Sequence, residues 1–590
     1  MRIPVFKNVK SEKKQINTFG GICNRDTSKE NVLFDMKNMT GSRYPRISSR
    51  ERRGILETGD DKIYGINSID IYRNGEVIKN ALVVETDKRL KAYYEDGGKT
   101  VSCELFNTGG VLTKGEKCRV VSGSKLYYFP DNISYDLVSG DITVLGYSAE
   151  YKLGASDGFF YEIALEPCDI EGNDADESSY FRRIKRYVYE LDASGERGEL
   201  HGCMKFSTGI ETGDSVKLSG FADAYMNGNY NIKGIAHNNE SIIVESINTY
   251  KQSTGSVFLK REVPKMDYVI ACNNRLWGCR YGTDNEGNFV NEIYASALGD
   301  GRNWQKFLGI STDSWTVSVG CQGTFTGAVV MDGCPVFFKE DAIIKIYGDY
   351  PSEFCLTENK QRGIENGSSK SAVFVNDDLY YKTYSGIVRY DGGIPVNVDD
   401  DLGDVRYYNA VAGGVGDKYY VSMEKSDGER ELLVFDTSLH LWHKEDSVNI
   451  KSFCRCGGEL FFLSESDKEQ KSLIYSTVVN GYTEPEGSFE WLFETSPQGY
   501  SVTGHKYVSS IQIRMECDYD TTAEISIEYD GDGVWHRARA IYGNVSNLII
   551  PIRPKRCDSF RLRMSGKGNI CILSIIKKIE ECSPFSKREL

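Results

Sequence analysis

A short pattern of turn and strand residues recurs along the first 480 residues, and it restricts the possible folds more than any other feature of this chain. A polar turn is followed by two or three aromatic or apolar residues in strand-like alternation. In the later part the pattern returns about every 40 residues, a spacing typical of β-propeller blades. The instances are residues 87–94, 123–129, 273–279, 333–338, 376–381, 416–421 and 457–462.

A single four-stranded sheet cannot keep both of its faces away from water, whereas sheets stacked radially cover one another. Six or seven such units fit into the chain. A pair of β-sandwiches with ordinary hairpins is the alternative, but the constant spacing over four consecutive units favours the propeller. We therefore predict an all-β protein with a β-propeller formed by residues 56–152 and 263–484.

Two stretches depart from this pattern and predict separate modules. Residues 153–262 turn polar and then show compact strands around the tight-turn dipeptide Asn227-Gly228, which predicts a small β-barrel inserted into a propeller loop. Residues 485–590 alternate apolar and polar positions, as in 509–517, which predicts a C-terminal antiparallel β-sandwich of the jelly-roll type. Helical periodicity is nearly absent.

Composition and charge exclude several classes of protein. The chain has 71 basic and 85 acidic residues and a net charge of −14, which argues against non-specific wrapping of nucleic acid. No segment reaches the roughly 18 consecutive apolar residues of a membrane helix. The start resembles no secretory signal, so we expect assembly in a cytosol and no membrane anchor.

The 16 cysteines are scattered, and none forms a CxxC pair. We expect free and mostly buried thiols rather than a disulfide scaffold or a zinc ribbon. Cys454 and Cys456 share one face if residues 452–457 form a strand.

Motifs for catalysis are missing. The chain has no P-loop, no GxGxxG and no GxSxG motif. Residues 296–304 approach the Asp-box pattern Ser-x-Asp-x-Gly-x-x-Trp, but Leu298 stands where the aspartate belongs and Asp300 comes two places late. Such boxes stabilise turns and do not catalyse. The sequence therefore predicts no enzyme, no catalytic residues and no cofactor site.

Three clusters invite a metal and have plainer interpretations. His440 and His443 lie three apart, and on a strand they face opposite sides, so they cannot share one ion. The run Asp399-Asp400-Asp401 could bind a divalent cation or form a solvated loop between blades. The stretch 530–533 (Asp-Gly-Asp-Gly) lacks the later glutamate of a calcium loop and predicts a hairpin turn. We predict no metal site.

Several stretches taken together carry a resemblance to a known family. They are residues 19–21, 34–40, 44–46 and 50–54, then 274–277, 293–300 and 303–304, then 337–340, 346–348 and 351–352, and finally 556–562. With these stretches the chain resembles the nozzle family of tailed phages, the β-propeller virion protein called tail tubular protein B in short-tailed phages. It is also similar to related virion proteins in phages and prophages of Firmicutes. The inserted barrel and the C-terminal sandwich are not general features of that family.

The resemblance implies a ring, usually of six copies, below the portal and adaptor, with a central channel for DNA. It implies no catalytic residues. We therefore expect a structural virion protein of a bacteriophage tail, a homohexameric ring that contacts the head–tail adaptor or portal and other tail proteins. Viral DNA would pass through it transiently, and the acidic net charge suits a conduit that does not hold phosphate.

Residues 1–55 are predicted to form an N-terminal docking arm that binds a neighbouring subunit or the adaptor. A solvated first strand and loop is the alternative. The basic residues that suggest the arm are Lys10, Lys13, Lys14, Arg43, Arg46, Arg50, Arg52 and Arg53.

The alternative function from another class is a glycan- or receptor-binding tail module. Tryptophan side chains on propellers and jelly-rolls stack on sugars, and Trp442, Trp491 and Trp535 are the candidates, with core packing as the other place for each. A glycosidase is a third option.

Overall fold

The protein is built from β-strands. The computed structural model describes residues 11–581 except 26–28, 57–61, 74, 87, 97–98, 108–109, 207, 467–470, 481–482 and 503. The described residues form strands β1 to β49 and three single-turn 3-10 helices, η1 (Ala224–Met226), η2 (Ser369–Ser371) and η3 (Asp400–Leu402), without an α-helix. The predicted all-β class is confirmed. No helix in the described part of the chain is long and apolar enough to span a bilayer.

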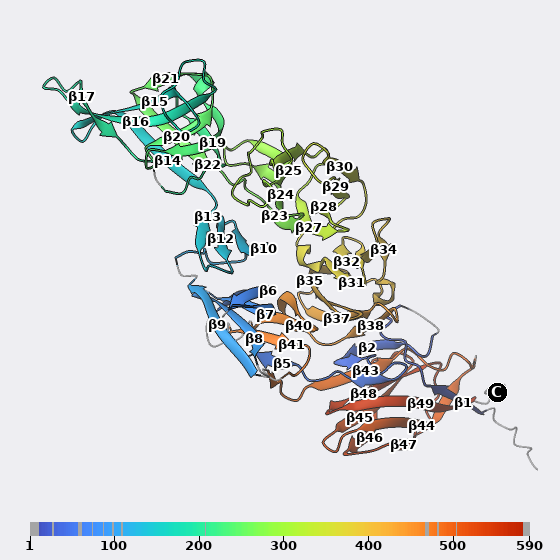
Figure 1. Cartoon of the computed structure of the whole chain (residues 1–590). Coiled ribbons are helices and arrows are strands. Elements are labelled where there is room, and N and C mark those ends of the chain that lie inside the picture. Colours follow the sequence, from blue (N-terminus) through green and yellow to red (C-terminus); the bar gives the residue numbers. More distant parts are fainter. Residues whose placement is uncertain are drawn as a thin grey trace, which may run out of the picture. The chain divides into compact units, whose positions relative to one another are not determined.

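Seven successive antiparallel sheets have the strand order of β-propeller blades, each strand pairing with the next along the chain (Figure 1). The first four are β6–β9 (Ile63–Arg73, Glu76–Thr86, Arg89–Asp96, Lys99–Asn107), β10–β13 (Cys118–Ser122, Lys125–Phe129, Ile133–Asp136, Ile142–Val144), β23–β26 (Tyr268–Cys272, Arg275–Thr283, Phe289–Ala295, Trp315–Ser318) and β27–β30 (Phe325–Met331, Cys334–Lys339, Ala342–Tyr347, Cys355–Asn359). The last three are β31–β34 (Val373–Val375, Asp378–Thr383, Gly386–Tyr390, Val396–Asn397), β35–β38 (Tyr407–Val415, Lys418–Lys425, Arg430–Asp436, Leu441–Lys444) and β39–β41 (Ile450–Cys456, Glu459–Ser466, Lys471–Ser476), the last extended by β5 (Gly54–Leu56) and β42 (Glu484–Pro485).

The recurring sequence pattern marks the first hairpin in six of the blades, whereas the instance at 87–94 leads into β8, the third strand of its blade. Asn273 and Asn274 form the two-residue turn between β23 and β24, and both have positive φ angles (51° and 56°), as a type I′ turn requires. A glycine of positive φ takes part in this turn in four other blades, and Asn376 and Asp377 (φ 50° and 67°) form it in a fifth. The further two-residue turns are 123–124, 332–333, 376–377, 416–417 and 457–458.

The chain divides into two compact units. The first contains residues up to Asp70, Ile78–Gly109 and the chain from Ile364 onward, and the second contains Ile71–Val77 and Gly110–Gly363. Within each unit, neighbouring blades bury aromatic and aliphatic side chains against each other. Trp277 of one blade packs with Phe337 and Ile344 of the next in the second unit.

The second unit contains the inserted domain as a closed barrel. Its strands are β14 (Tyr147–Ser156), β15 (Phe159–Cys168), β16 (Phe181–Leu191), β17 (Arg197–Cys203), β18 (Ser215–Ser219), β19 (Gly228–Ala236), β20 (Ser241–Glu245), β21 (Tyr250–Gln252) and β22 (Gly255–Arg261). The pairing path β14-β15-β16-β20-β19-β18-β22 returns to β14, so the barrel is closed, with β17 and β21 added outside the cycle. The domain starts earlier than the predicted boundary at 153.

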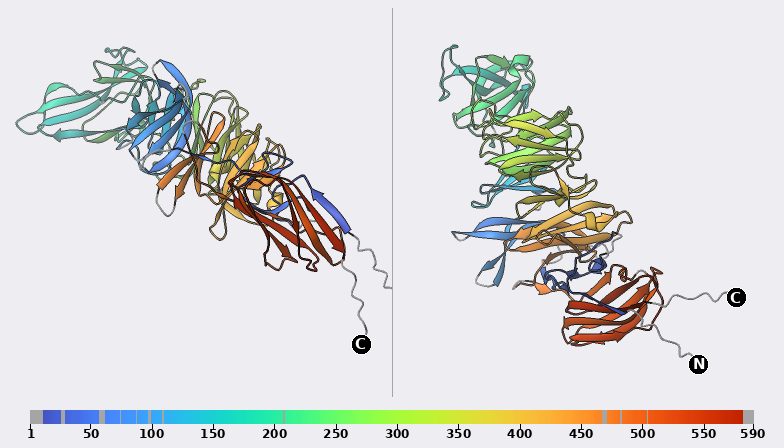
Figure 2. Two further views of the ribbon diagram at one scale, coloured as in Figure 1. Left: turned by 90° about the horizontal axis from the view of Figure 1, so that it is seen from below. Right: turned by 90° about the vertical axis from the view of Figure 1, so that its right-hand side faces the viewer.

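The first unit ends in a two-sheet sandwich built from both ends of the described chain (Figure 2). One sheet has the order β3 (Met39–Thr40), β4 (Ile47–Ser49), β49 (Ile570–Glu581), β44 (Lys506–Cys517), β47 (Asn547–Pro551), with β1 (Ser11–Ile16) also paired to β49. The other has the order β2 (Leu33–Lys37), β43 (Glu490–Thr495), β48 (Phe560–Lys567), β45 (Thr522–Tyr529), β46 (His536–Tyr542).

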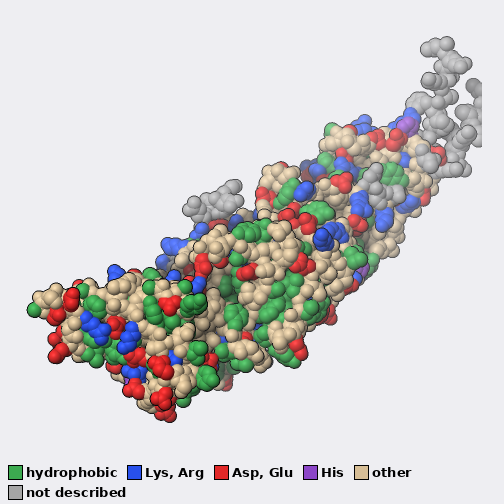
Figure 3. Space-filling model, turned by 90° about the horizontal axis from the view of Figure 1, so that it is seen from above, with side chains coloured by type: hydrophobic (Ala, Val, Ile, Leu, Met, Phe, Trp, Pro, Cys, Tyr) green, Lys and Arg blue, Asp and Glu red, His purple; other side chains and the backbone are tan. Residues whose placement is uncertain are grey.

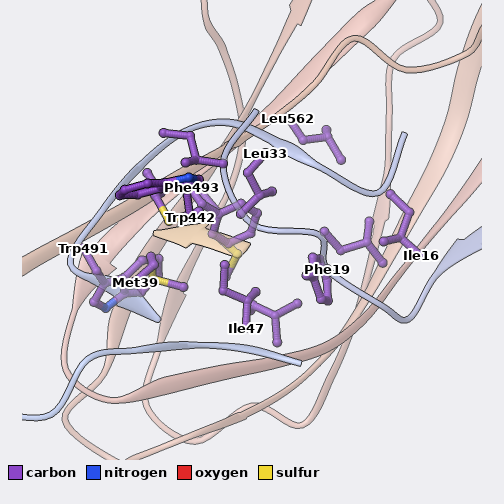
Figure 4. Packing of buried hydrophobic residues seen from close by; sticks show 14 of the residues in the cluster. Ile16, Phe19, Leu33, Met39, Ile47, Trp442, Trp491, Phe493 and Leu562 are labelled. Atoms are coloured by element: carbon purple, nitrogen blue, oxygen red, sulfur yellow. The ribbon is translucent and has the colours of Figure 1, made fainter. Parts of the chain in front are cut away.

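The described residues of the predicted docking arm pair with their own chain, and docking of this segment on a neighbouring subunit stays a prediction. Strands β1 to β4 pair within the sandwich of their own chain, and β5 completes the last blade by pairing with β41. The physical reason is hydrophobic: the segment carries apolar side chains that are buried in the core of the first unit beside Trp442 and Trp491 (Figure 4). Those labelled in the figure are Ile16, Phe19, Leu33, Met39 and Ile47. Residues 1–10, with Lys10, lie outside the described residues.

Candidate functional site

The segment that approaches an Asp-box forms a turn, as the sequence predicts. Asp300 accepts hydrogen bonds from the backbone N–H of Arg302 at 2.9 Å and from Asn303 Nδ2 at 2.6 Å. Trp304 is buried and donates from Nε1 to the carbonyl of Gly301 at 2.9 Å. These hydrogen bonds stabilise the turn.

The same turn holds the inserted barrel, a role that sequence reasoning missed. Asn303 Oδ1 accepts from the backbone N–H of Ser215 at 2.9 Å, and its Nδ2 lies 3.3 Å from Asp214 Oδ1. Asp214 is fully buried and forms an ion pair with Arg261, whose side chain is also buried. Asp214 also lies 3.6 Å from Arg302 of the turn, so the contacts of Arg302 and Asn303 with Asp214 and Ser215 join the barrel to its blade.

The histidines and aspartates considered for metals serve other purposes. His443 is buried on β38, and burial lowers its pKa to about 4, with Lys418 adding to the shift. His440 occupies the preceding turn with a positive φ of 53°. Asp399 accepts from the backbone N–H of Ile387 at 2.9 Å, and Asp400 pairs with Arg25 at 3.0 Å.

Residues 530–533 form the turn between β45 and β46, as predicted. Among the described residues, no three His, Cys, Asp or Glu side chains gather in a way that could hold a metal ion.

The two cysteines of β39 are not activated thiols. The cysteines within the described ranges are free, and most are buried. Cys454 and Cys456 lie on β39, as expected, and burial is the largest cause of the raised pKa of each.

Buried charges join the N-terminal segment to the last blades. Arg53 donates to Asp446 at 2.7 Å and to Glu445 at 2.6 Å, and Arg50 pairs with Glu486. Burial by itself would lower the pKa of Arg53, but Asp446 and Glu445 outweigh it and hold the pKa above its ordinary value. We call these five side chains the arginine clamp. Their charges pair with one another, so the clamp can hold two segments of the chain together but offers no free acid or base.

A cavity of about 680 Å³ lies beside the clamp, between the last blades and the sandwich. Its wall combines cations such as Arg43 and Lys418 with anions such as Glu516, and Arg43 and Arg46 each approach Glu516 to 3.6 Å. Because positive and negative side chains line the cavity in similar numbers, it does not favour a ligand of either charge.

The three candidate tryptophans have different surroundings. Trp442 and Trp491 are 1% exposed and belong to the core of the first unit, so neither can stack on a sugar. Trp535 is half-buried on the outer face of the sandwich, where the guanidinium of Arg563 lies 4.0 Å from its ring centroid.

Around Trp535 the sandwich carries charged residues that the sequence analysis did not single out. Arg561 and Arg563 project outward from β48 and pair with Glu494 and Glu528, and Arg561 also lies 4.8 Å from the ring of Phe34. The alternation of 559–564 was a usable signal, since its polar positions are all on one face. The partner carboxylates lie on other strands and could not be chosen from the sequence.

Comparisons with known proteins add little. No protein-family model matches the chain, and no curated protein matches it either. Raptor of Chaetomium thermophilum has a TM-score of 0.28 at 10% identity, with 73% of this chain matched to 30% of that chain. The β-propeller domain of Cps50 (Swd1) of Myceliophteria thermophila has a TM-score of 0.26 at 7% identity, with 72% and 100% covered. Trypanosoma rangeli sialidase in complex with sialic acid has a TM-score of 0.25 at 9% identity, with 88% and 96% covered. Such low TM-scores carry no functional inference, and the fold rests on the strand order of the chain itself.

Proposed function

We propose that this chain is a structural, non-enzymatic virion protein of a bacteriophage tail, a nozzle that forms a ring below the portal or adaptor and conducts the genome during ejection. One observation carries the proposal: four of the stretches that resemble the nozzle family serve the scaffold. Residues 19–21 and 34–40 lie in or against the core of the first unit, 50–54 contain the clamp arginines, and 274–277 begin with a blade turn. Stretches that lie in turns, in the core and in the arginine clamp fit a mechanical part better than a catalyst.

The pairing of strands from both ends of the described chain supports a mechanical role. Strand β1 pairs with β49 over residues 11–16 and 575–580, and β5 lies in the last blade. Pulling on either end of the described chain therefore loads the hydrogen bonds between β1 and β49.

The charge distribution supports a conduit that lets DNA pass. The net charge is −14. Basic side chains are interspersed with acidic ones on the face shown in Figure 3, without an unbroken basic stripe. Duplex DNA needs such a stripe to release its counterions and bind tightly.

Electron microscopy of the purified full chain tests the proposal. Negative-stain images should show rings of about six copies with a central opening, and a fluorescent DNA duplex should not be retained at physiological salt. Monomers or trimers at every protein concentration would contradict the ring. Tight, salt-sensitive duplex binding would contradict the passive conduit.

A further inference from the structure

A lysine lies among apolar residues on the core-facing side of the sandwich. Lys577 is on β49, and its neighbours on the same face of that strand, Ile575 and Ile579, belong to the core of the first unit. The side chain of Lys577 is only 1% exposed. A lysine is almost never fully buried without partners, because an ammonium group is costly to remove from water. The groups that surround its Nζ atom therefore need an explanation.

Two side chains hold the Nζ atom of Lys577. It donates to Glu30 Oε2 at 2.5 Å and also to Gln498 Oε1. The side chain of Glu30 is 15% exposed, and its Oε1 accepts from the backbone N–H of Gly499 at 2.9 Å. Gln498 is fully buried and follows β43, and its backbone pairs with Phe560 of β48, so it belongs to the opposite sheet. We call Lys577, Gln498 and Glu30 the buried triad.

The carboxamide of Gln498 is held in one orientation. Its Nε2 donates to the backbone carbonyl of Glu30 at 2.9 Å and to that of Ser496 at 2.8 Å, which uses both N–H groups. The Oε1 atom is therefore the one that faces the ammonium of Lys577. Because the carbonyl carbon Cδ is only about 1.23 Å from Oε1, the same contact brings Nζ within the distance of about 3.5 Å at which an amine can attack that carbon.

Burial and the neighbouring carboxylate prepare the amine for this attack. Burial lowers the pKa of Lys577, and Glu30 opposes the shift without cancelling it. Burial by itself would raise the pKa of Glu30, but the hydrogen bond and the charge of Lys577 outweigh it and keep that pKa below its ordinary value. At neutral pH, Glu30 is therefore a carboxylate beside an ammonium that loses its proton more easily than an exposed lysine does. The burial of Gln498 also keeps water from competing for its carbonyl carbon.

We propose that Lys577 and Gln498 form an isopeptide bond, with Glu30 as the proton carrier. Glu30 takes a proton from the ammonium of Lys577, and the neutral Nζ attacks Cδ of Gln498. The bond between Cδ and Nε2 then breaks, while Glu30 passes to Nε2 the protons that Nζ gives up. In total, one ammonium and one carboxamide become one secondary amide and one ammonium ion. Two protons move from Nζ to Nε2, and the reaction needs no oxidant or further reactant.

The isopeptide bond ties the two sheets of the sandwich together. It links β49 of one sheet to the segment after β43 in the other, across 79 positions of the chain. Such a link reduces the conformational entropy of the unfolded chain, as a disulfide does, but it does not depend on an oxidising compartment. The bond is additional to the ring and conduit of the proposed function and depends on neither.

Mass spectrometry of the purified full chain tests the proposal. The denatured chain should weigh about 17 Da less than its sequence, because one ammonia is lost. A tryptic digest should contain residues 472–506 joined to residues 568–578. Lys577→Met and Glu30→Gln should each keep the full mass of their own sequence and release the two segments as separate peptides. The joined peptides of the unaltered chain decide whether the bond exists even if a variant does not fold.

Glu365→Gln is the matched control, because Glu365 accepts from the buried Lys382 at 2.9 Å in a pair of the same kind. The other hydrogen bond of Lys382 Nζ goes to the backbone carbonyl of Thr383 and not to a carboxamide. This variant should lose ammonia like the unaltered chain, and circular dichroism shows which variants are folded. The proposal is overturned if the unaltered chain has its full mass, if Lys577→Met or Glu30→Gln still loses ammonia, or if the control does not.

Discussion

Replacing Arg53 by methionine tests whether the arginine clamp holds the N-terminal segment in the last blade. The Arg53 side chain is 3% exposed and donates to Asp446 at 2.7 Å and to Glu445 at 2.6 Å. Methionine keeps most of the apolar volume but leaves these two carboxylates without their main partner.

The cost can be worked from these contacts. Removing one partner of a buried ion pair costs about 3–5 kcal/mol, because the remaining charge is still buried. Arg50 also lies 3.9 Å from Glu445 and 3.8 Å from Asp446, so it compensates in part. We therefore expect the lower end, a loss of about 3 kcal/mol in the free energy of unfolding of the first unit.

Urea unfolding followed by tryptophan fluorescence measures this loss, because Trp442 and Trp491 are buried in the core of the same unit. Limited proteolysis should also cut residues 50–56 faster. Arg52→Met is the control, since Arg52 is exposed and adjacent in sequence, and it should change stability by less than about 0.5 kcal/mol. A double-mutant cycle with Glu445→Gln should show coupling. A loss below about 1 kcal/mol for Arg53→Met, or equal to that of the control, would refute the reasoning.

Three further predictions concern burial and close packing. Burial holds the folded pKa of His443 near 4, below its ordinary 6.5, so the unfolded chain binds the proton more readily between these values. The contribution of neutral His443 to the free energy of unfolding should therefore be fully present above pH 6.5 and fall by about 3 kcal/mol as the pH drops to 4. His443→Gln should flatten this pH dependence in urea titrations. An unchanged pH dependence would contradict the attribution to His443. Asp214→Ala leaves the buried charge of Arg261 without its partner, and we expect a loss of about 3 kcal/mol in the free energy of unfolding. Limited proteolysis should become faster where the barrel joins its blade. Unaltered cleavage would count against this contact between barrel and blade. Gly363→Ala would place a Cβ atom 1.9 Å from a backbone oxygen and should lower the free energy of unfolding by about 1–3 kcal/mol in thermal unfolding. Gly458→Ala, whose Cβ atom meets open space, should be nearly neutral. Equal effects would show that the backbone relaxes around the added Cβ atom at position 363 at no cost.

Local features of the fold could be predicted because they are encoded over a few residues. The two-residue turn at Asn273 and Asn274 needs two positive φ angles, and asparagine tolerates them. The residues on either side of the turn alternate between apolar and polar or are continuously apolar, which predicts β-strands and the repeated blade. The turn at 530–533 was predicted for the same reason.

The site residues could be predicted only in part. The sequence offers Trp535, Trp442 and Trp491 equally as sugar-stacking candidates, but Trp442 and Trp491 lie in the core. The residue type alone does not show whether a tryptophan side chain is buried.

The sequence alone determined the β class, the turn positions and the acidic balance, since each depends on neighbouring residues or on a sum over the chain. Only the tertiary structure decided which strands meet. Strand β1 pairs with β49 across more than five hundred residues, and β5 joins the last blade rather than an external partner. Backbone hydrogen bonds are the same for every strand, so partner choice depends on side-chain packing summed over the whole core, and that sum exists only in the folded chain.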